Sequence, residues 1–161
     1  GGTFNRTEFN VEMDKKEIIA AISPVGYPKN RSIRERVIRT FIKADKRIDF
    51  NQLFFKGKNL GPIPKEYPYY KYLQSVQVAP SASNKQPWRI VLLDNTFHFY
   101  LKRNEGYASQ LKFYILSIDI GIALAHMYLT LNEDNISTTF IENKLLDIEG
   151  FEYVISISIK T

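Results

Sequence analysis

The chain has 161 residues, of which 44% are hydrophobic and 14% aromatic; this length and composition predict one ordinary globular domain and exclude a disordered chain. It contains no cysteine, which excludes disulfides, thiolate metal sites and a cysteine nucleophile. Much of the net charge of +5 lies between residues 29 and 47, which leaves nucleic acid, acidic lipid and a phosphorylated cofactor open as ligands.

The first part of the chain is predicted to alternate short helices with irregular segments. Asp14 is placed to cap a short helix, and the apolar run 18–22 ends at the proline- and glycine-containing stretch 23–28. Apolar residues at a spacing of about 3.6 then predict a helix over residues 33–42 with a basic opposite face. We expect the apolar face of this helix to be docked. Asp49 is placed to cap a further short helix.

The second part of the chain is predicted to combine helices with paired strands. A stretch rich in glycine and proline, residues 56–68, precedes it. Two apolar runs flank the turn-favouring residues 94–96 and predict a hairpin. The longest helix is predicted over residues 109–132, and strand-like runs follow at residues 138–141 and 153–159. The expected fold class is therefore α+β with an antiparallel component.

The most specific motif spans residues 79–89, Ala-Pro-Ser-Ala-Ser-Asn-Lys-Gln-Pro-Trp-Arg. Pro80 ends the preceding helix, because a residue before proline is pushed out of the α region. The small polar residues that follow predict a loop whose backbone N–H groups and hydroxyls can hold a phosphate or a polar ring edge. Pro87 then leads into a buried apolar strand.

This motif resembles the Pro-Ser-x-x-Asn-x-Gln-Pro-Trp pattern of the FMN-dependent nitroreductase family, where the segment lines the flavin pocket at a two-fold interface. Residues 118–126 resemble the Asp-x-Gly-x-Ala pattern of the long central helix of that family, and residues 23–28 resemble its Gly-Tyr-Pro near the end of the fold. The inverted order of these motifs resembles the branch in which two degenerate repeats are fused in one chain. The resemblance implies a nitroreductase-like α+β fold, with a central, mainly antiparallel sheet flanked by helices.

On this interpretation residues 1–55 are the C-terminal part of a first repeat, residues 56–65 are a linker and residues 66–161 are the second repeat. The full-length chain would then contain a pseudo-dimer. The sequence starts at Gly1 without an initiator methionine, and the Arg-rich motif of the family would lie before it. We therefore interpret the chain as a C-terminal fragment, and we expect the fragment alone to be inactive and to bind FMN weakly or not at all.

The resemblance implies a set of FMN-binding residues drawn from both repeats: Gly2, Thr3, Lys46, Arg47, Pro80, Ser81, Ala82, Asn84 and Gln86. An arginine suits the phosphate because its guanidinium offers paired donors in a fixed fork. Gly2 and Thr3 would place backbone N–H groups near the reactive flavin nitrogen, where a glycine permits close approach. Asn84 and Gln86 are expected to hold the loop through backbone hydrogen bonds rather than to touch the flavin ring.

Each assignment has a plainer alternative. Lys46 and Arg47 could belong to a solvated basic face, residues 80–82 to an ordinary helix-to-strand loop, and residues 2–3 to a frayed terminus. Four other residues receive structural interpretations: Trp88 in the core, Asp119 as a helix residue rather than a base, His98 on the hairpin surface and His126 on the long helix. Neither histidine has partners at ligand spacing, so no metal site is predicted.

The implied activity is that of a flavin-dependent oxidoreductase, which passes electrons from NAD(P)H through FMN to a nitroaromatic, a quinone or a similar small-molecule acceptor. The cofactor carries the chemistry, so we name no catalytic residue. We expect a cytoplasmic protein without a membrane partner, because no apolar run approaches about 18 residues and no signal peptide is visible.

Two alternative functions stay open. One is a degenerate repeat that does not bind flavin. The other is a phosphate- or nucleic-acid-binding module that uses the basic helix 31–47. Against a nucleic-acid partner we weigh the apolar face of this helix, which predicts that the helix is docked, and the lack of aromatic residues on its basic face.

Overall fold

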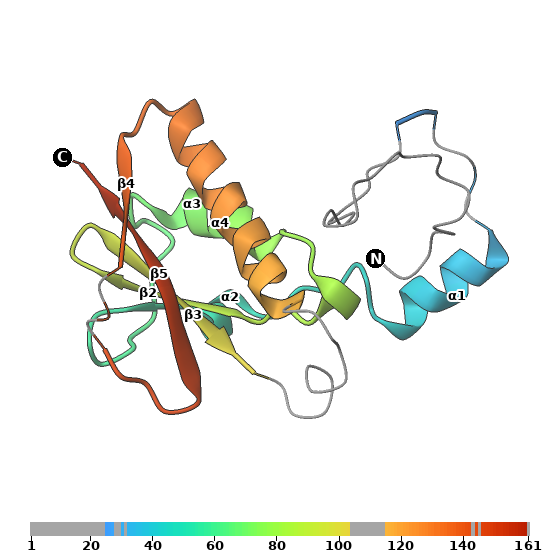
Figure 1. The fold of residues 1–161 in the computed structure, drawn as a ribbon, viewed down its shortest axis with the longest axis horizontal. Coiled ribbons are helices and arrows are strands. Elements are labelled where there is room, and N and C mark those ends of the chain that lie inside the picture. Colours follow the sequence, from blue (N-terminus) through green and yellow to red (C-terminus); the bar gives the residue numbers. More distant parts are fainter. Residues whose placement is uncertain are drawn as a thin grey trace, which may run out of the picture.

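The structure is a computed structural model that describes residues 25–27, 30, 32–103, 115–142, 144 and 146–160. Helices and strands are mixed along these ranges, as Figure 1 shows. In chain order they are α1 (Ile33–Phe41), α2 (Phe50–Leu53), β1 (Phe54–Lys56), α3 (Tyr70–Gln77), the 3-10 turn η2 (Ala82–Asn84), β2 (Trp88–Leu93), β3 (Thr96–Lys102), α4 (Ile115–Glu133), β4 (Thr138–Ile141) and β5 (Phe151–Ile159).

One five-stranded sheet organises the fold, with the strand order β1-β2-β3-β5-β4. β1 pairs with β2 in parallel, whereas the other three pairings are antiparallel. The predicted hairpin is β2 and β3, joined at residues 94 and 95, and the two predicted closing strands are β4 and β5. The prediction of an α+β fold with a mainly antiparallel sheet flanked by helices is therefore confirmed.

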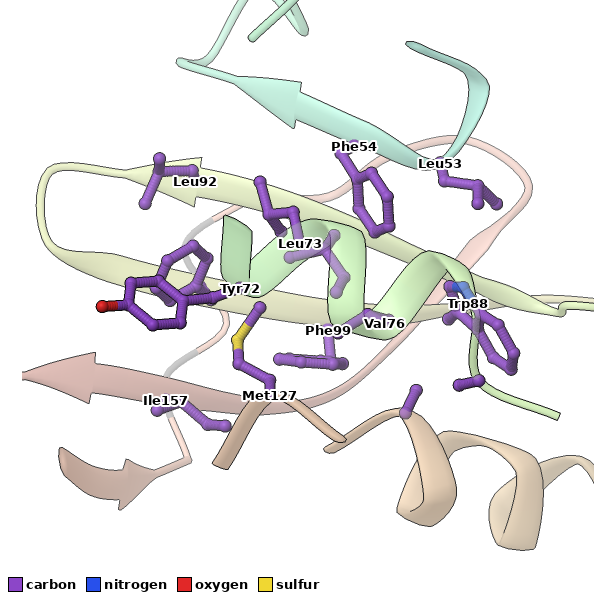
Figure 2. Packing of buried hydrophobic residues seen from close by; sticks show 14 of the residues in the cluster. Leu53, Phe54, Tyr72, Leu73, Val76, Trp88, Leu92, Phe99, Met127 and Ile157 are labelled. Carbon is purple, nitrogen blue, oxygen red and sulfur yellow. The ribbon is translucent and has the colours of Figure 1, made fainter. Parts of the chain in front are cut away.

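The core lies between the sheet and the helices α3 and α4. Side chains alternate between the two faces of a strand, so Phe97, Phe99 and Leu101 of β3 join one cluster with Ile157 of β5. Figure 2 shows Tyr72, Leu73 and Val76 of α3 on this cluster, with Met127 of α4 beside Phe99. Trp88, at the start of β2, is fully buried in it, as predicted.

The helix ends follow from local chemistry. Ser32 caps α1, because its Oγ accepts a hydrogen bond from the Glu35 N–H at 3.2 Å. Asp49 caps α2 as predicted, with its Oδ1 2.9 Å from the Asn51 nitrogen. Beyond α1, Lys43 has a φ of +52°, a left-handed conformation that does not continue a right-handed helix.

One packing prediction is wrong, and a second is not met within the part of the chain that the structure describes. His98 is fully buried instead of lying on the hairpin surface, because β5 pairs with the other side of β3 and sets Ser156 directly opposite His98. The apolar face of α1 is not docked within the described part of the chain: Val37 is 62% exposed and Phe41 is 87% exposed. Figure 1 shows α1 standing away from the sheet. Helical periodicity predicts the helix but does not identify what covers its apolar face.

The predicted linker at residues 56–65 is ordered and joined to the sheet. The backbones of Lys56 and Gly61 exchange two hydrogen bonds, at 2.8 and 2.9 Å, and Ile63 is buried in the core. β1 lies immediately before this turn and forms one edge of the sheet. The assignment of residues on either side to two repeats stays a prediction.

Helix α4 is the one described helix whose length and apolar composition would allow it to cross a membrane. The expectation that no apolar run approaches the length of a membrane span is therefore not met by α4. A core helix of a soluble protein can meet the same criterion, and one side of α4 contributes to the core through Leu116, Ile120, Ala123, Met127 and Leu131.

Candidate functional site

The motif loop, residues 80–87, joins α3 to β2 and is closed by hydrogen bonds within itself. The Ser81 Oγ accepts a hydrogen bond from the Gln86 N–H at 2.8 Å, and the Ser81 carbonyl accepts one from the Asn84 N–H at 3.0 Å. Ser83, Asn84 and Gln86 all have left-handed φ angles, of 49°, 54° and 47°. Such conformations cost free energy in residues other than glycine, so the surrounding contacts must hold the loop in this shape.

One of these contacts comes from α4. The Asp119 Oδ1 accepts a hydrogen bond from the Ala82 N–H at 2.9 Å, and Asp119 is only 2% exposed. Burial raises the pKa of this carboxyl group, and the hydrogen bond from Ala82 opposes that rise. Within the described ranges, the second carboxylate oxygen, Oδ2, is buried without a hydrogen-bond partner.

A second set of contacts joins the motif loop to the basic segment that follows α1, residues 43–48. The Asn84 Nδ2 donates to the carbonyls of Lys43 at 2.6 Å and Lys46 at 2.8 Å. The Gln86 Oε1 accepts a hydrogen bond from the Ile48 N–H at 2.9 Å, and Gln86 is buried. The prediction that these two amides hold backbone groups is confirmed.

Arg47 also joins the basic segment to the motif loop. Its Nη1 donates to the carbonyls of Ala44 and Lys46 and, at 3.3 Å, to the Asn84 Oδ1. Its Nη2 donates to the Val78 carbonyl at 3.1 Å, just before the motif loop. The structure thus brings together Arg47 and the motif loop, which are distant in sequence: the residue is exposed, and its guanidinium is hydrogen-bonded to protein acceptors.

A hollow of about 480 Å³ opens where the basic segment meets the motif loop. Four basic residues line it: Lys43, Lys46, Arg47 and Lys85. The rest of its wall is apolar, hydroxyl or amide: Phe41, Ile42, Ile48, Ser83, Asn84 and Gln86. A concave surface that combines several cations with apolar and aromatic area suits a ligand that has both an anionic group and a flat apolar part.

The other predicted site residues are placed as follows. Pro80 is exposed at the start of the motif loop, and Ser81 and Ala82 are half-buried in it. Gly2 and Thr3 lie outside the described residues. His126 lies on α4, as predicted, with its Nδ1 3.0 Å from the Ser75 carbonyl of α3.

Lys43, Lys85 and Asp119 lie at the site without having been predicted there from the sequence. Lys85 lies inside the recognised motif, and its charge was a usable signal. The signal for Asp119 was also present, because it is the single charged residue in the apolar stretch 118–125. An isolated charge in an apolar helix is costly unless another group binds it, and here that group is the backbone of the motif loop.

A model of one protein family matches most of the chain. The model of a family described as "Putative TM nitroreductase" matches residues 1–131. The chain belongs to this nitroreductase family. The match includes α1, the basic segment, the motif loop and nearly all of α4, and therefore every element of the site described above.

Two further comparisons were made. No curated protein matches the chain. Among solved structures, the crystal structure of a "putative nitroreductase" from Thermotoga maritima MSB8 is similar, with 22% sequence identity and a TM-score of 0.46. The alignment covers 71% of this chain and 41% of that one, so the chain spans less than half of the length of that protein.

Proposed function

We propose that the chain belongs to an FMN-dependent oxidoreductase of the nitroreductase type, which passes electrons from NAD(P)H to a nitroaromatic, a quinone or a similar small acceptor. The proposal includes a cytoplasmic location and a pseudo-dimer in the full-length chain. Membership of the nitroreductase family supports the reaction class. The observation that carries the proposal is the hollow, where the motif loop and four basic residues meet.

The residues around the hollow fit the chemistry of FMN. A phosphate needs cations and N–H donors, and Lys43, Lys46 and Lys85 bring positive charge to the lining of the hollow. A flat ring needs apolar contact, and Phe41 and Ile48 line the same hollow. When bound, FMN supplies the hydride and electron transfer. In this proposal the lysines bind the phosphate, and Arg47 and the motif loop hold the wall of the hollow in shape.

No protein acid or base is needed in this proposal. Arg47, Asn84 and Gln86 use their hydrogen-bonding groups on one another and on backbone groups, so their role is to fix the loop. A preformed wall lowers the entropy cost of binding, because fewer groups need to be ordered when the ligand arrives.

The test is a flavin titration of the full-length protein and of its Lys43→Gln/Lys46→Gln variant, with FMN and riboflavin compared under the same conditions. Losing two cations beside the phosphate should weaken FMN binding by about tenfold or more and leave riboflavin binding nearly unchanged. Lys65→Gln is the matched control, since Lys65 is an exposed lysine that does not line the hollow. Wild-type protein that binds neither flavin would contradict the proposed function.

A further inference from the structure

Asp119 is a buried acid that the proposed function does not use. It lies on α4, is 2% exposed and has one oxygen on the Ala82 N–H and one without a partner among the described residues. A buried carboxylate with a single hydrogen bond is expensive, and an apolar residue at this place in the helix would pack without that cost. The acid therefore stabilises the fold poorly and calls for another explanation.

The partner of Asp119 supplies that explanation. Ala82 begins η2, and the next residues, Ser83 and Asn84, have left-handed backbones. A loop with several left-handed residues has competing conformations of lower local energy, in which its carbonyls and side chains would point elsewhere. A hydrogen bond to a charged acceptor is about twice as strong as a neutral one, so a carboxylate on a rigid helix is an effective way to hold the first N–H of η2.

We propose that Asp119 is a positioning residue for the flavin site: by holding the Ala82 N–H it keeps the following residues 83–86 in the shape that forms the wall of the hollow. This inference rests on the proposed function. It assigns no contact between Asp119 and the ligand. It differs from a purely structural role, because removing the acid should then change flavin binding without a matching change in overall stability.

The first test needs no ligand. Burial raises the pKa of Asp119 and the Ala82 N–H lowers it, and no charged side chain of the described residues contributes. If the two groups are bonded, the NMR shift of the Ala82 amide proton should follow the titration of Asp119, with a midpoint above 3.8, the usual value for an aspartate. In Asp119→Asn that titration should be absent. It should persist in the control Asp134→Asn, whose acid lies beyond the opposite end of α4.

The second test measures FMN affinity and urea unfolding of the full-length protein. Asp119→Asn keeps an oxygen acceptor without the charge and should bind FMN about tenfold more weakly than the wild type; Asp119→Ala should bind it more weakly still. The urea midpoints of the wild type and the two variants should not fall in the same order as their FMN affinities, because Asp119→Asn also removes a buried charge. Partial rescue by asparagine, together with an Ala82 titration that depends on Asp119, would support the proposal.

Two outcomes would overturn the inference, and they differ from failure of the proposed function. If all variants bind FMN as tightly as the wild type, Asp119 does not position the site although the flavin function stands. If affinity and urea midpoint fall in the same order, the role is structural. Wild-type protein that binds no flavin, with the Ala82 titration intact, would instead reject the flavin function and with it the role of Asp119 in a flavin site.

Discussion

Arg47 is exposed, yet it contacts acceptors on three separate parts of the chain and so connects them. Its partners are the carbonyls of Ala44 and Lys46, the carbonyl of Val78 and the side chain of Asn84. The resemblance to the nitroreductase family suggested a phosphate-binding arginine at this position. The geometry gives the guanidinium a second task, because each donor used on a carbonyl is less available to an incoming anion.

We therefore expect Arg47→Ala to weaken the binding of FMN and of riboflavin by similar factors. The variant loses the contacts that join the basic segment to the motif loop, so the wall of the hollow should loosen for both ligands. Fluorescence titration with the two flavins measures this directly. A loss confined to FMN would return Arg47 to the role of a phosphate ligand. Lys43→Gln/Lys46→Gln serves as the comparison, since there the loss is expected for FMN alone.

The helices α3 and α4 are joined at one end by a polar cluster of three residues. The Tyr72 hydroxyl donates to the Asp134 Oδ2, and Lys71 forms an ion pair with the same carboxylate. The hydrogen bonds from Lys71 and Tyr72 lower the pKa of Asp134. Figure 2 shows the remainder of the Tyr72 ring against the core, so one side chain serves both the core and the cluster.

This cluster predicts a dependence of stability on pH. The folded-state pKa of Asp134 lies below its unfolded value, so its contribution is present above about pH 5 and is lost as the pH falls through and below 3.8. Tyr72→Phe removes one of the hydrogen bonds that lower this pKa. Its urea midpoint should be below that of the wild type at pH 7, and the difference should shrink by pH 3. A difference that is constant over this range would assign the loss to packing.

At the scale of elements, periodicity and turn chemistry were sufficient for the hairpin, for α1 and α4 and for both closing strands, because each depends on residues near in sequence. The errors concern long-range packing. His98 is buried because β5, more than 50 residues away in sequence, pairs beside it and places Ser156 2.7 Å from its Nδ1. The turn between Lys56 and Gly61 could likewise not be predicted, since glycine and proline are typical of a tight turn and of a linker alike.

For the candidate site, the motif indicated which residues matter but not what each one does. That Asn84 and Gln86 bind backbone groups could be predicted, because loop amides carry both donors and acceptors; that most of these groups belong to residues 43–48 could not, since those residues are distant in sequence. The position of Asp119 under Ala82 could not, since it depends on how α4 lies against the motif loop. The same holds for the hollow, which exists only because residues 43–48 fold back onto the loop.

Over the whole molecule, the core and the site occupy different places. The core lies between the sheet and the helices α3 and α4, which Figure 1 shows beside one another. The hollow is lined instead by the basic segment and the motif loop. Phe99 is fully buried in the core, and Ala82 is half-buried in the loop. A substitution at each position should therefore affect a different property of the protein, stability in one case and ligand binding in the other.

We predict that Ala82→Glu prevents FMN binding and preserves the fold. Ala82 precedes Ser83, which lines the hollow, and its N–H binds the buried Asp119. The new carboxylate would therefore disturb a loop that must adopt one conformation, and its charge would repel a phosphate in the neighbouring hollow. Phe99→Ala is the matched core variant; it should lower the free energy of unfolding by about 3–5 kcal/mol, the usual cost of such a cavity, and leave the FMN affinity of the folded fraction unchanged. Far-UV circular dichroism, urea unfolding and flavin content of the full-length variants measure the two effects. Native-like dichroism with normal flavin content in Ala82→Glu would remove the motif loop from the site.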